Sequence, residues 1–428
     1  MQRSRQGRVG EHLNGDEAAQ GRAKQRAFCI AALEAGDELS ELRELLRTAG
    51  VAVVGQAVQH RDKPHPNSYL GPGKLEEVKA AAIAADANVI ACDDELSPRQ
   101  ERNLEKELGL PVVDRTSIIL DIFAGHAHSA EGKLQVELAQ LEYNMARMRG
   151  LWTHLERLGA SAAQPGIGAR GPGESQIETD RRLARNRITA LRRKLAGVSS
   201  SRATMRAERE RAHLPQVALA GYTNAGKSTL LNRLTGAEVG VRDRLFHTLD
   251  PTTRELRVNG RPYLLTDTVG FIRKLPHQVV DAFAATLHET RSADLILHVV
   301  DASADEEEMT AMLRAVDETL DAVGAGDRPR LLVLNKADAL DAERREELLP
   351  AHPEGVLISA ATGEGLDELG DRIEEEFRRS LRTVDLLLPY AEGARLAELH
   401  DAAGDLERTD TANGVRVRAR VSATVAER

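Results

Sequence analysis

The chain has 428 residues, a length that accommodates two to four domains with buried cores. Hydrophobic residues make up 41% and charged residues 29%, as in ordinary globular proteins, and no apolar run has transmembrane length. Aromatic residues make up only 3%, which argues against nucleic-acid binding dominated by base stacking on aromatic side chains. Because the sequence also lacks a recognisable secretory signal, we expect a cytoplasmic protein with no membrane span.

The cysteines and the charge distribution narrow the class further. Cys29 and Cys92 are the two cysteines, and both lie in apolar runs, which predicts reduced core thiols rather than a metal cluster. The net charge of −9 is uneven, because residues 181–211 hold 11 basic and 2 acidic residues and leave −18 for the rest. Such asymmetry indicates either a nucleic-acid contact or a solvated helix face.

The first part of the chain predicts a disordered tail followed by a small α/β domain. Residues 1–25 are polar and lack apolar periodicity. Residues 26–127 alternate short apolar runs with helical patterns, which indicates a parallel sheet covered by helices. The expected strands are residues 28–32, 51–58, 89–92 and 112–113, and the expected helices are residues 38–48, 74–85 and 98–108.

Residues 128–213 predict an antiparallel helical hairpin. In the first helix, about 131–159, apolar residues follow a 4-3 spacing that calls for a partner helix or, alternatively, a globular core. The partner is expected to begin after Gln176, and the glycine-rich residues 165–174 form a mobile tip loop, which includes Arg170, or a mere connector. The two apolar stripes are Leu134, Leu138, Leu141, Met145, Met148, Trp152 and Leu155, and Ile177, Ala184, Ile188, Leu191 and Leu195.

A phosphate-binding loop of pattern G-x-x-x-x-G-K-[ST] opens the next region. An apolar run precedes the loop and an apolar helical pattern follows it, which is the strand-loop-helix context that phosphate binding requires. Lys227 is expected to reach the β- and γ-phosphates, and the Ser228 hydroxyl to bind Mg²⁺. The expected phosphate-binding residues are Gly221, Tyr222, Thr223, Asn224, Ala225, Gly226, Lys227 and Ser228.

The loop belongs to a predicted doubly wound domain, residues 214–381. Its further strands are expected at residues 264–266, 295–300, 331–334 and 356–358. Residues 382–428 are expected to form a small α+β appendage, with a helix and a terminal alternation at residues 415–421. The fold class is therefore multidomain α/β.

Two motifs that follow the loop suit a metal-bound nucleoside triphosphate. Asp267 ends a predicted strand 40 residues after Lys227 and begins a D-x-x-G motif, in which the carboxylate can hold Mg²⁺ through water and the glycine amide can contact the γ-phosphate. This motif is Asp267, Thr268, Val269 and Gly270. In residues 246–253 a threonine should ligate Mg²⁺ and sense the γ-phosphate, but spacing does not choose among Thr248, Thr252 and Thr253.

A third motif, at the end of another strand, selects guanine. The Asp338 carboxylate can accept hydrogen bonds from guanine N1–H and the exocyclic amine, a pair that adenine cannot supply. Asn335 can bond the base or tie neighbouring loops, and the stem of Lys336 can cover the ring. The motif is Asn335, Lys336, Ala337 and Asp338, and a later backbone amide among Ser359, Ala360 and Ala361 could donate to guanine O6.

Together these motifs resemble those of translational-class GTPases, and the chain most closely resembles the HflX family of ribosome-associated GTPases. The resemblance spans about residues 26–380 and rests on residues 246–253, 267–276, the glycine-rich loop with 174–182, and 69–74. It implies that Thr248 ligates Mg²⁺ and that Phe246, His247, Thr248, Leu249 and Asp250 form the first switch. It also implies hydrolysis of GTP to GDP and phosphate, and binding of the 50S large ribosomal subunit through the amino-terminal domain and hairpin.

The resemblance has consequences for mechanism. Phe271 stands where many GTPases have a glutamine that orients water, so we expect it to pack in the core and intrinsic turnover to be slow until a partner such as the ribosome completes the site. Asn224 resembles an asparagine that helps bind K⁺ in cation-dependent GTPases. The residues expected to face ribosomal RNA are Arg170, Arg181, Arg182 and Arg185.

Three functions remain open from sequence. The first is a GTPase that remodels or splits ribosomes. The second is an RNA remodeller driven by ATP as well as GTP, with residues 71–74 as a second nucleotide or RNA site, although a glycine-proline turn before a helix also explains that segment. The third is a signalling or scaffold GTPase that binds a protein through the hairpin. Because the hairpin can pair within the chain, we expect a monomer.

Overall fold

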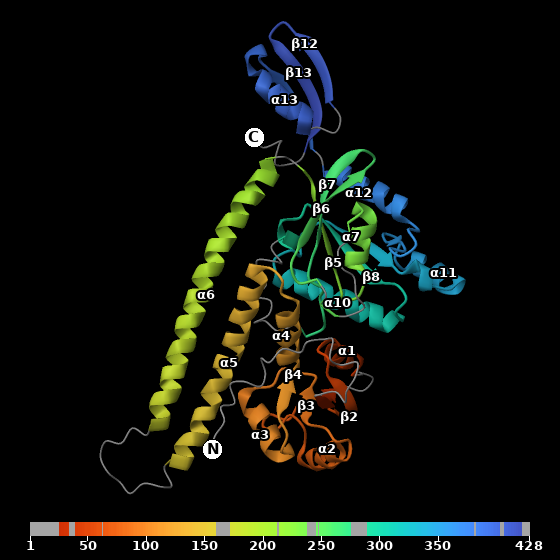
Figure 1. Cartoon of the computed structure of the whole chain (residues 1–428). Coiled ribbons are helices and arrows are strands. Elements are labelled where there is room, and N and C mark those ends of the chain that lie inside the picture. Colours follow the sequence, from red (N-terminus) through yellow and green to blue (C-terminus); the bar gives the residue numbers. More distant parts are fainter. Residues whose placement is uncertain are drawn as a thin grey trace.

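Three sheets and a long helical hairpin make up the described part of the chain (Figure 1). The computed structural model describes residues 25–33, 39–61, 63–159, 172–211, 214–237, 245–246, 248–274, 289–380, 382–402 and 406–421. A six-stranded sheet occupies the middle of the molecule, between the four-stranded amino-terminal sheet and the three-stranded carboxy-terminal sheet. This arrangement confirms the predicted multidomain α/β fold class. No described helix is both long and apolar enough to cross a membrane.

The four-stranded sheet is parallel throughout, in the order β2-β1-β3-β4. Successive side chains of a strand point to opposite faces, so Cys29 of β1 packs under α1 and α4, whereas Phe28 packs under α2 and α3. Both cysteines are buried and free, and burial raises the pKa of Cys29 to about 12. The elements are β1 (Arg26–Leu33), α1 (Ser40–Thr48), β2 (Ala52–His60), α2 (Pro72–Ala84), β3 (Val89–Cys92), α3 (Pro98–Leu108), β4 (Val112–Asp114) and α4 (Arg115–His126).

Helix α4 was missed by the sequence analysis. Its apolar residues surround the helix almost completely, so they form no single 3.6-residue stripe. Asp114 caps its first turn by accepting a hydrogen bond of 2.9 Å from the Ser117 amide. Because α4 is covered on more than one side, its broad apolar surface marks a contact between two parts of the molecule.

The helices α5 (Ala130–Gly159) and α6 (Pro172–Arg211) run side by side as the predicted hairpin (Figure 1). Leu138, Ile188 and Leu191 form its buried seam, with Leu134, Leu141, Met145 and Leu195 packed against it. The second helix begins at Pro172, earlier than predicted, because proline suits the first turn of a helix. Residues 172–174 are therefore helical rather than part of the loop, and residues 160–171, with Arg170, lie outside the described residues. So do the side chains of Met148, Trp152, Leu155 and Ile177.

The six-stranded sheet has the order β10-β9-β8-β5-β7-β6, and all its neighbours pair in parallel except the antiparallel edge strand β6. Helix α10 covers one face, and helices α7 and α12 cover the other. The elements are β5 (Gln216–Gly221), α7 (Lys227–Thr235), β6 (Thr252–Val258), β7 (Arg261–Asp267), β8 (Leu295–Asp301), α10 (Glu306–Ala322), β9 (Arg330–Asn335), the 3₁₀ turn η3 (Ala337–Ala339), α11 (Ala342–Ala351), β10 (Val356–Leu357) and α12 (Leu366–Ser380).

The carboxy-terminal sheet is antiparallel, in the order β11-β13-β12, and α13 packs on one face. The predicted alternation is present in β13, where Val415 and Val417 are buried and Arg416 and Arg418 are exposed. The elements are β11 (Arg382–Leu388), the 3₁₀ turn η4 (Tyr390–Glu392), α13 (Gly393–Ala402), β12 (Leu406–Thr411) and β13 (Gly414–Val421).

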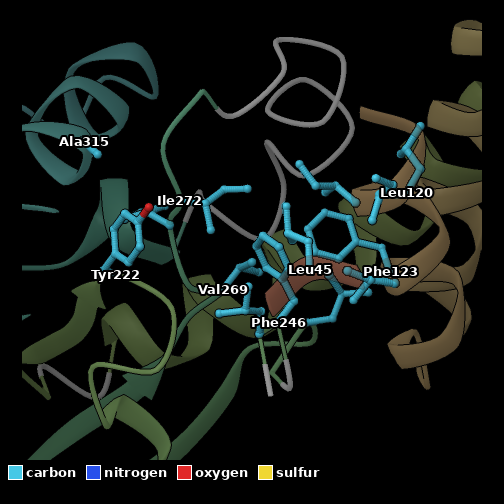
Figure 2. Close-up of a cluster of buried hydrophobic side chains, with 14 of the residues drawn as sticks. Leu45, Leu120, Phe123, Tyr222, Phe246, Val269, Ile272 and Ala315 are labelled. Atoms are coloured by element: carbon cyan, nitrogen blue, oxygen red, sulfur yellow. The ribbon is translucent and has the colours of Figure 1, made fainter. Parts of the chain in front are cut away.

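One hydrophobic core joins the amino-terminal sheet to the six-stranded sheet. Figure 2 shows Leu45 of α1 and Phe123 of α4 packed against residues that follow the strands of the second sheet. The Phe123 and Phe246 rings meet edge to face, with centroids 4.7 Å apart and planes at 78°. The loops at this end of the six-stranded sheet are therefore packed between two parts of the molecule.

Candidate nucleotide-binding site

The phosphate loop lies at the carboxyl end of β5, where α7 begins. A Cβ atom on Gly221 would collide with the Val299 carbonyl oxygen, and one on Gly226 would collide with the Asn335 amide nitrogen, so only glycine fits at either position. The backbone approaches its neighbours this closely because the loop must curl tightly before the helix. The helix amino terminus then faces the inside of the curl, which is the arrangement that binds phosphate.

Lys227 is folded back over this loop. Its Nζ donates hydrogen bonds to the carbonyl oxygens of Gly221, at 3.0 Å, and Tyr222, at 2.7 Å. The side chain is buried, and this burial lowers the pKa of Lys227 to about 8 against the opposing effect of Asp267. A buried ammonium group held by neutral carbonyls is poised to gain from an anion, so the loop favours a bound phosphate.

Three oxygen-bearing side chains meet beside the loop. The Ser228 hydroxyl donates to Asp267 Oδ2 at 2.6 Å, and Ser228 Oγ lies 2.8 Å from Thr248 Oγ1. Asp267 is fully buried, its Oδ1 bonds to no other atom, and burial raises its pKa. Hydroxyl and carboxylate oxygens are the ligands that Mg²⁺ prefers, and an orphaned buried carboxylate oxygen needs a partner. The residues present therefore fit a magnesium ion.

The structure separates the three candidate threonines of the first switch. Thr252 and Thr253 belong to β6, and Thr253 Oγ1 lies 2.9 Å from Thr266 Oγ1 of the neighbouring strand. Thr248 precedes the strand and is the one beside Ser228. Sequence spacing missed this distinction because it depends on where β6 begins. His247, also predicted for this segment, lies outside the described residues.

The guanine motif follows β9. Asn335 ties neighbouring loops, because its amide donates to the Ala225 carbonyl at 2.8 Å and its Oδ1 accepts from the Ala360 amide at 2.9 Å. Asp338 is exposed, and its Oδ1 accepts a hydrogen bond of 2.5 Å from the Ser359 hydroxyl. The Asp338 carboxylate is thus oriented by a buried side chain, and the Ala360 amide is already engaged.

Lys336 and Ala337 complete this corner. Lys336 has a φ of 70° and lies 2.5 Å from Asp301 Oδ2 at the end of β8, a partner that the sequence motifs did not indicate. Ala337 is buried, and its amide donates to the Ile358 carbonyl at 2.9 Å. Since the carboxyl ends of neighbouring parallel strands meet at one edge of a sheet, the predicted motifs are brought together there. A candidate O6 donor in this corner is the Ala361 amide rather than that of Ala360.

The D-x-x-G motif is attached directly to the phosphate loop. The Thr223 amide donates to the Phe271 carbonyl at 2.8 Å, and the Phe271 amide donates to the Gly221 carbonyl at 3.1 Å. The Phe271 side chain is 1% exposed, which confirms the expected packing role. Thr268 is also buried, and its hydroxyl donates to the Leu219 carbonyl at 2.6 Å. The motif therefore lies against the loop with little space between them.

A buried charged network joins this motif to the amino-terminal sheet. Arg115 is 1% exposed, binds Asp93 Oδ1 at 2.8 Å and the Glu41 carboxylate, and donates to the Arg273 carbonyl at 2.9 Å. The Tyr222 hydroxyl donates to Glu41 and accepts from the Arg273 amide at 2.9 Å. These partners lie far apart in sequence, so no local pattern indicates them. Removal of one partner from such a buried pair typically costs about 3–5 kcal/mol.

Lys274 adds a second link to the same sheet. Its Nζ lies 2.5 Å from Asp94 Oδ1 and 3.4 Å from Asp93 Oδ2. The Tyr69 hydroxyl donates to the other oxygen of Asp94 at 2.5 Å. Burial raises the pKa of Asp93 above its usual value, and this effect outweighs the opposing effect of the neighbouring Arg115 guanidinium. The segment after Gly270 is thus held by carboxylates of the amino-terminal sheet.

The first switch is linked to the hairpin. Asp250 Oδ2 accepts hydrogen bonds from the Ser129 amide at 2.8 Å and the His128 amide at 3.3 Å, and the Ser129 hydroxyl bonds to Oδ1. Leu249 is buried in the core shared by the two sheets. The carboxylate therefore lies at the amino terminus of α5, where the helix dipole favours a negative charge.

The predicted RNA-facing arginines lie on α6, with the exception of Arg170. Arg182 and Arg185 are exposed, and Arg181 is half-buried. Arg187 and Arg192 instead pair with glutamates of α5. The basic run therefore supplies both exposed charge and links within the hairpin.

The chain is similar in sequence to known GTP-binding proteins over most of its length. A family model described as "GTP-binding GTPase N-terminal" matches residues 36–124, "GTP-binding GTPase Middle Region" matches residues 126–209, and "50S ribosome-binding GTPase" matches residues 216–336. GTPase HflX of Lacrimispora saccharolytica is 48% identical over 375 residues, 86% of each chain. GTPase HflX of Caldanaerobacter subterraneus is 44% identical over 412 residues, 95% of this chain and 93% of that one. A GTP-binding protein from Sulfolobus solfataricus, solved with GDP, covers 82% of this chain and 98% of its own, with 26% identity and a TM-score of 0.42.

Proposed function

The chain belongs to the HflX family of GTPases and binds and hydrolyses GTP, and from that premise we propose that it is a nucleotide-controlled switch that binds the 50S ribosomal subunit and remodels or splits ribosomes. The observation that carries the proposal is the attachment of both nucleotide-sensing segments to the parts that would face RNA. Asp250 bonds to the start of the hairpin, and Arg273 and Lys274 bond to residues of the amino-terminal α/β domain. A change in either segment must alter these contacts.

We propose that the phosphate loop binds the phosphates and that Asp338 selects guanine. Lys227 lies where it can meet the β- and γ-phosphates, and the GTPase family generally uses Mg²⁺ with the nucleotide. Ser228, Thr248 and Asp267 would hold that ion, Asp267 through water. When bound, Mg²⁺ supplies positive charge that neutralises the phosphates. Lys227→Ala should weaken GDP and GTP binding at least about 100-fold, the loss expected when a charged partner is removed. Unchanged affinity in equilibrium titration would refute the loop assignment.

A second, monovalent cation site is proposed at Asn224 in the same loop. Its φ is 62°, so the backbone turns sharply at this residue. We propose that its amide oxygen contributes to a K⁺ site that adds positive charge during hydrolysis. Hydrolysis should then be faster in KCl than in NaCl at equal ionic strength, and equal rates would rule the site out.

The hairpin is proposed to supply the RNA contact through the exposed arginines of α6, together with Arg170. Cosedimentation with purified 50S subunits tests the function directly. Binding should be strong with a non-hydrolysable GTP analogue, weak with GDP, and lower as salt rises. Equal binding with both nucleotides would contradict a nucleotide-controlled switch. Failure to bind ribosomes in either state would favour the signalling or scaffold function.

The alternative in which ATP drives RNA remodelling gains no support from residues 71–74. Gly71 caps α2, Pro72 occupies its first turn, and the Gly71 amide donates to Gln59 at 2.9 Å. These contacts are those of a turn that begins a helix. ATP hydrolysis that survives Lys227→Ala would favour the alternative.

A further inference from the structure

The hydroxyl of Thr223 is buried and has no partner in the protein. Thr223 is the third residue of the phosphate loop, its side chain is 6% exposed, and its Oγ1 bonds to no other atom. Nearly all buried polar side-chain atoms in native proteins are hydrogen-bonded. A buried hydroxyl without a hydrogen bond is unfavourable, so the loop retains a group that a bound molecule can satisfy.

The surroundings of Thr223 identify which part of that molecule it faces. A Cβ atom on Gly270 would lie 2.7 Å from Thr223 Cγ2 and 3.1 Å from Lys227 Nζ. Thr223 therefore lies beside Gly270 and the Lys227 ammonium group, with its methyl carbon on the side of Gly270. In phosphoryl transfer by P-loop enzymes, the loop lysine contacts the γ-phosphate. Thr223 thus lies beside the phosphoryl group that hydrolysis transfers.

Three groups next to this hydroxyl cannot orient a water molecule in its place. The Phe271 side chain has no polar atom and is buried. The backbone amide of Thr223 is already bonded to the Phe271 carbonyl, and the Phe271 amide to the Gly221 carbonyl. Among these groups the Thr223 hydroxyl alone keeps its hydrogen-bonding capacity, since a hydroxyl can donate one hydrogen bond and accept two.

We propose that Thr223 is a catalytic residue, whose Oγ1 accepts a hydrogen bond from the attacking water and donates one to a γ-phosphoryl oxygen. The water oxygen forms a bond to the γ-phosphorus, and the bond between that phosphorus and the β–γ bridging oxygen breaks. A water proton ends on a phosphate oxygen, which gives GDP and inorganic phosphate. Thr223 forms no covalent bond and is unchanged at the end. The inference rests on the proposed phosphate-loop assignment.

Three substitutions test the hydroxyl separately from the shape of the loop. Thr223→Val keeps the shape and removes the hydroxyl, Thr223→Ser keeps the hydroxyl, and Thr223→Ala removes it with less bulk. Single-turnover GTP hydrolysis and GDP affinity are measured for each. The Thr223→Val and Thr223→Ala variants should hydrolyse GTP about 100-fold more slowly than the parent, the lower end of the range typical of one positioned catalytic group. The Thr223→Ser variant should hydrolyse GTP at a rate within about threefold of the parent rate. All three variants should bind GDP with an affinity within about twofold of that of the parent protein.

Thr290→Val is the matched control. Thr290 is also fully buried with an unbonded Oγ1, but it precedes β8, whose opposite end faces the site. Loss of the Thr290 hydroxyl should leave the rate of GTP hydrolysis unchanged. The proposal is overturned if Thr223→Val or Thr223→Ala hydrolyses GTP at the parent rate. It is also overturned if the GDP affinity of these variants falls by the same factor as their rate of hydrolysis, because the hydroxyl would then only shape the loop. Retained GDP binding in Lys227→Ala would instead refute the loop assignment, and this proposal with it.

Discussion

The carboxylate of Asp250 accepts a hydrogen bond of 2.8 Å from the backbone amide of Ser129, the residue that precedes α5. The contact joins positions 121 residues apart. A Cβ atom on Gly132 would lie only 2.8 Å from Asp250 Oδ1, so the first turn of the helix leaves room for the carboxylate through a glycine. The segment that carries Thr248 is thereby fastened to the hairpin.

Removal of this carboxylate should loosen both partners. Asp250→Ala is expected to lower the free energy of unfolding by about 1–2 kcal/mol, as loss of a helix-capping group does, and to reduce the preference for a GTP analogue over GDP. Asp305→Ala is the control, because Asp305 caps α10 by accepting from the Glu308 amide at 2.8 Å. Urea unfolding and nucleotide titration check the two effects. An equal change of nucleotide preference in both variants would contradict the link.

Asp338→Asn should exchange the preferred base. An amide can accept from the N1–H of xanthine and donate to its O2, whereas guanine offers two donors to this position. GTP affinity should fall at least about 100-fold, and XTP should bind better than GTP. Asp341→Asn is the matched control, since Asp341 caps α11 and asparagine caps equally well. Fluorescence titration with both nucleotides measures these affinities. If Asp338→Asn did not bind XTP more tightly than the parent protein does, the assignment of Asp338 as the residue that selects guanine would be wrong.

His298 should make the protein sensitive to mild acid. Burial lowers the pKa of His298 to about 4, with Arg330 and Lys227 adding to the effect, so the folded state stays neutral while the unfolded state protonates near pH 6.5. The unfolded state then binds more protons between about pH 6.5 and 4, and stability falls as pH falls through that window, by at most about 3 kcal/mol. Urea midpoints across the window should fall less steeply in His298→Gln. Parallel curves would contradict the assignment.

Charge reversal on the hairpin should weaken 50S binding. Arg182→Glu with Arg185→Glu changes two exposed residues of α6, and the loss of cosedimentation should become more visible as salt rises. Arg378→Glu with Arg379→Glu on α12 makes the same change of charge elsewhere. An equal loss in the two double variants would indicate general electrostatics rather than an RNA-binding face.

The sequence predicts where the residues of the site lie along the strands, but it does not predict the contacts that join the site to the rest of the molecule. Asp267 and Asn335 each end a strand, and parallel strands place their carboxyl ends at one edge of a sheet, so the position of both residues at that edge follows from pattern alone. The spacing of the motif did not choose among the three threonines, because that choice depends on where β6 begins, and Thr248 was expected only from the family resemblance. Helix α4 has no single apolar stripe to reveal it. The hydrogen bond from the Arg115 guanidinium to the Arg273 carbonyl joins residues 158 positions apart, a separation at which local periodicity carries no information.

The length of α6 has a mechanical consequence. The helix has 40 residues and ends at Arg211, and β5 then runs from Gln216 to the first residue of the phosphate loop. At 1.5 Å per residue the helix is about 60 Å long, so a rotation of about 10° at the junction carries its far end about 10 Å. In the proposed switch, the hairpin would amplify small movements at the nucleotide site. A shift at Gly221 that rotates α6 in this way would displace Pro172, at the other end of the helix, by about a nanometre.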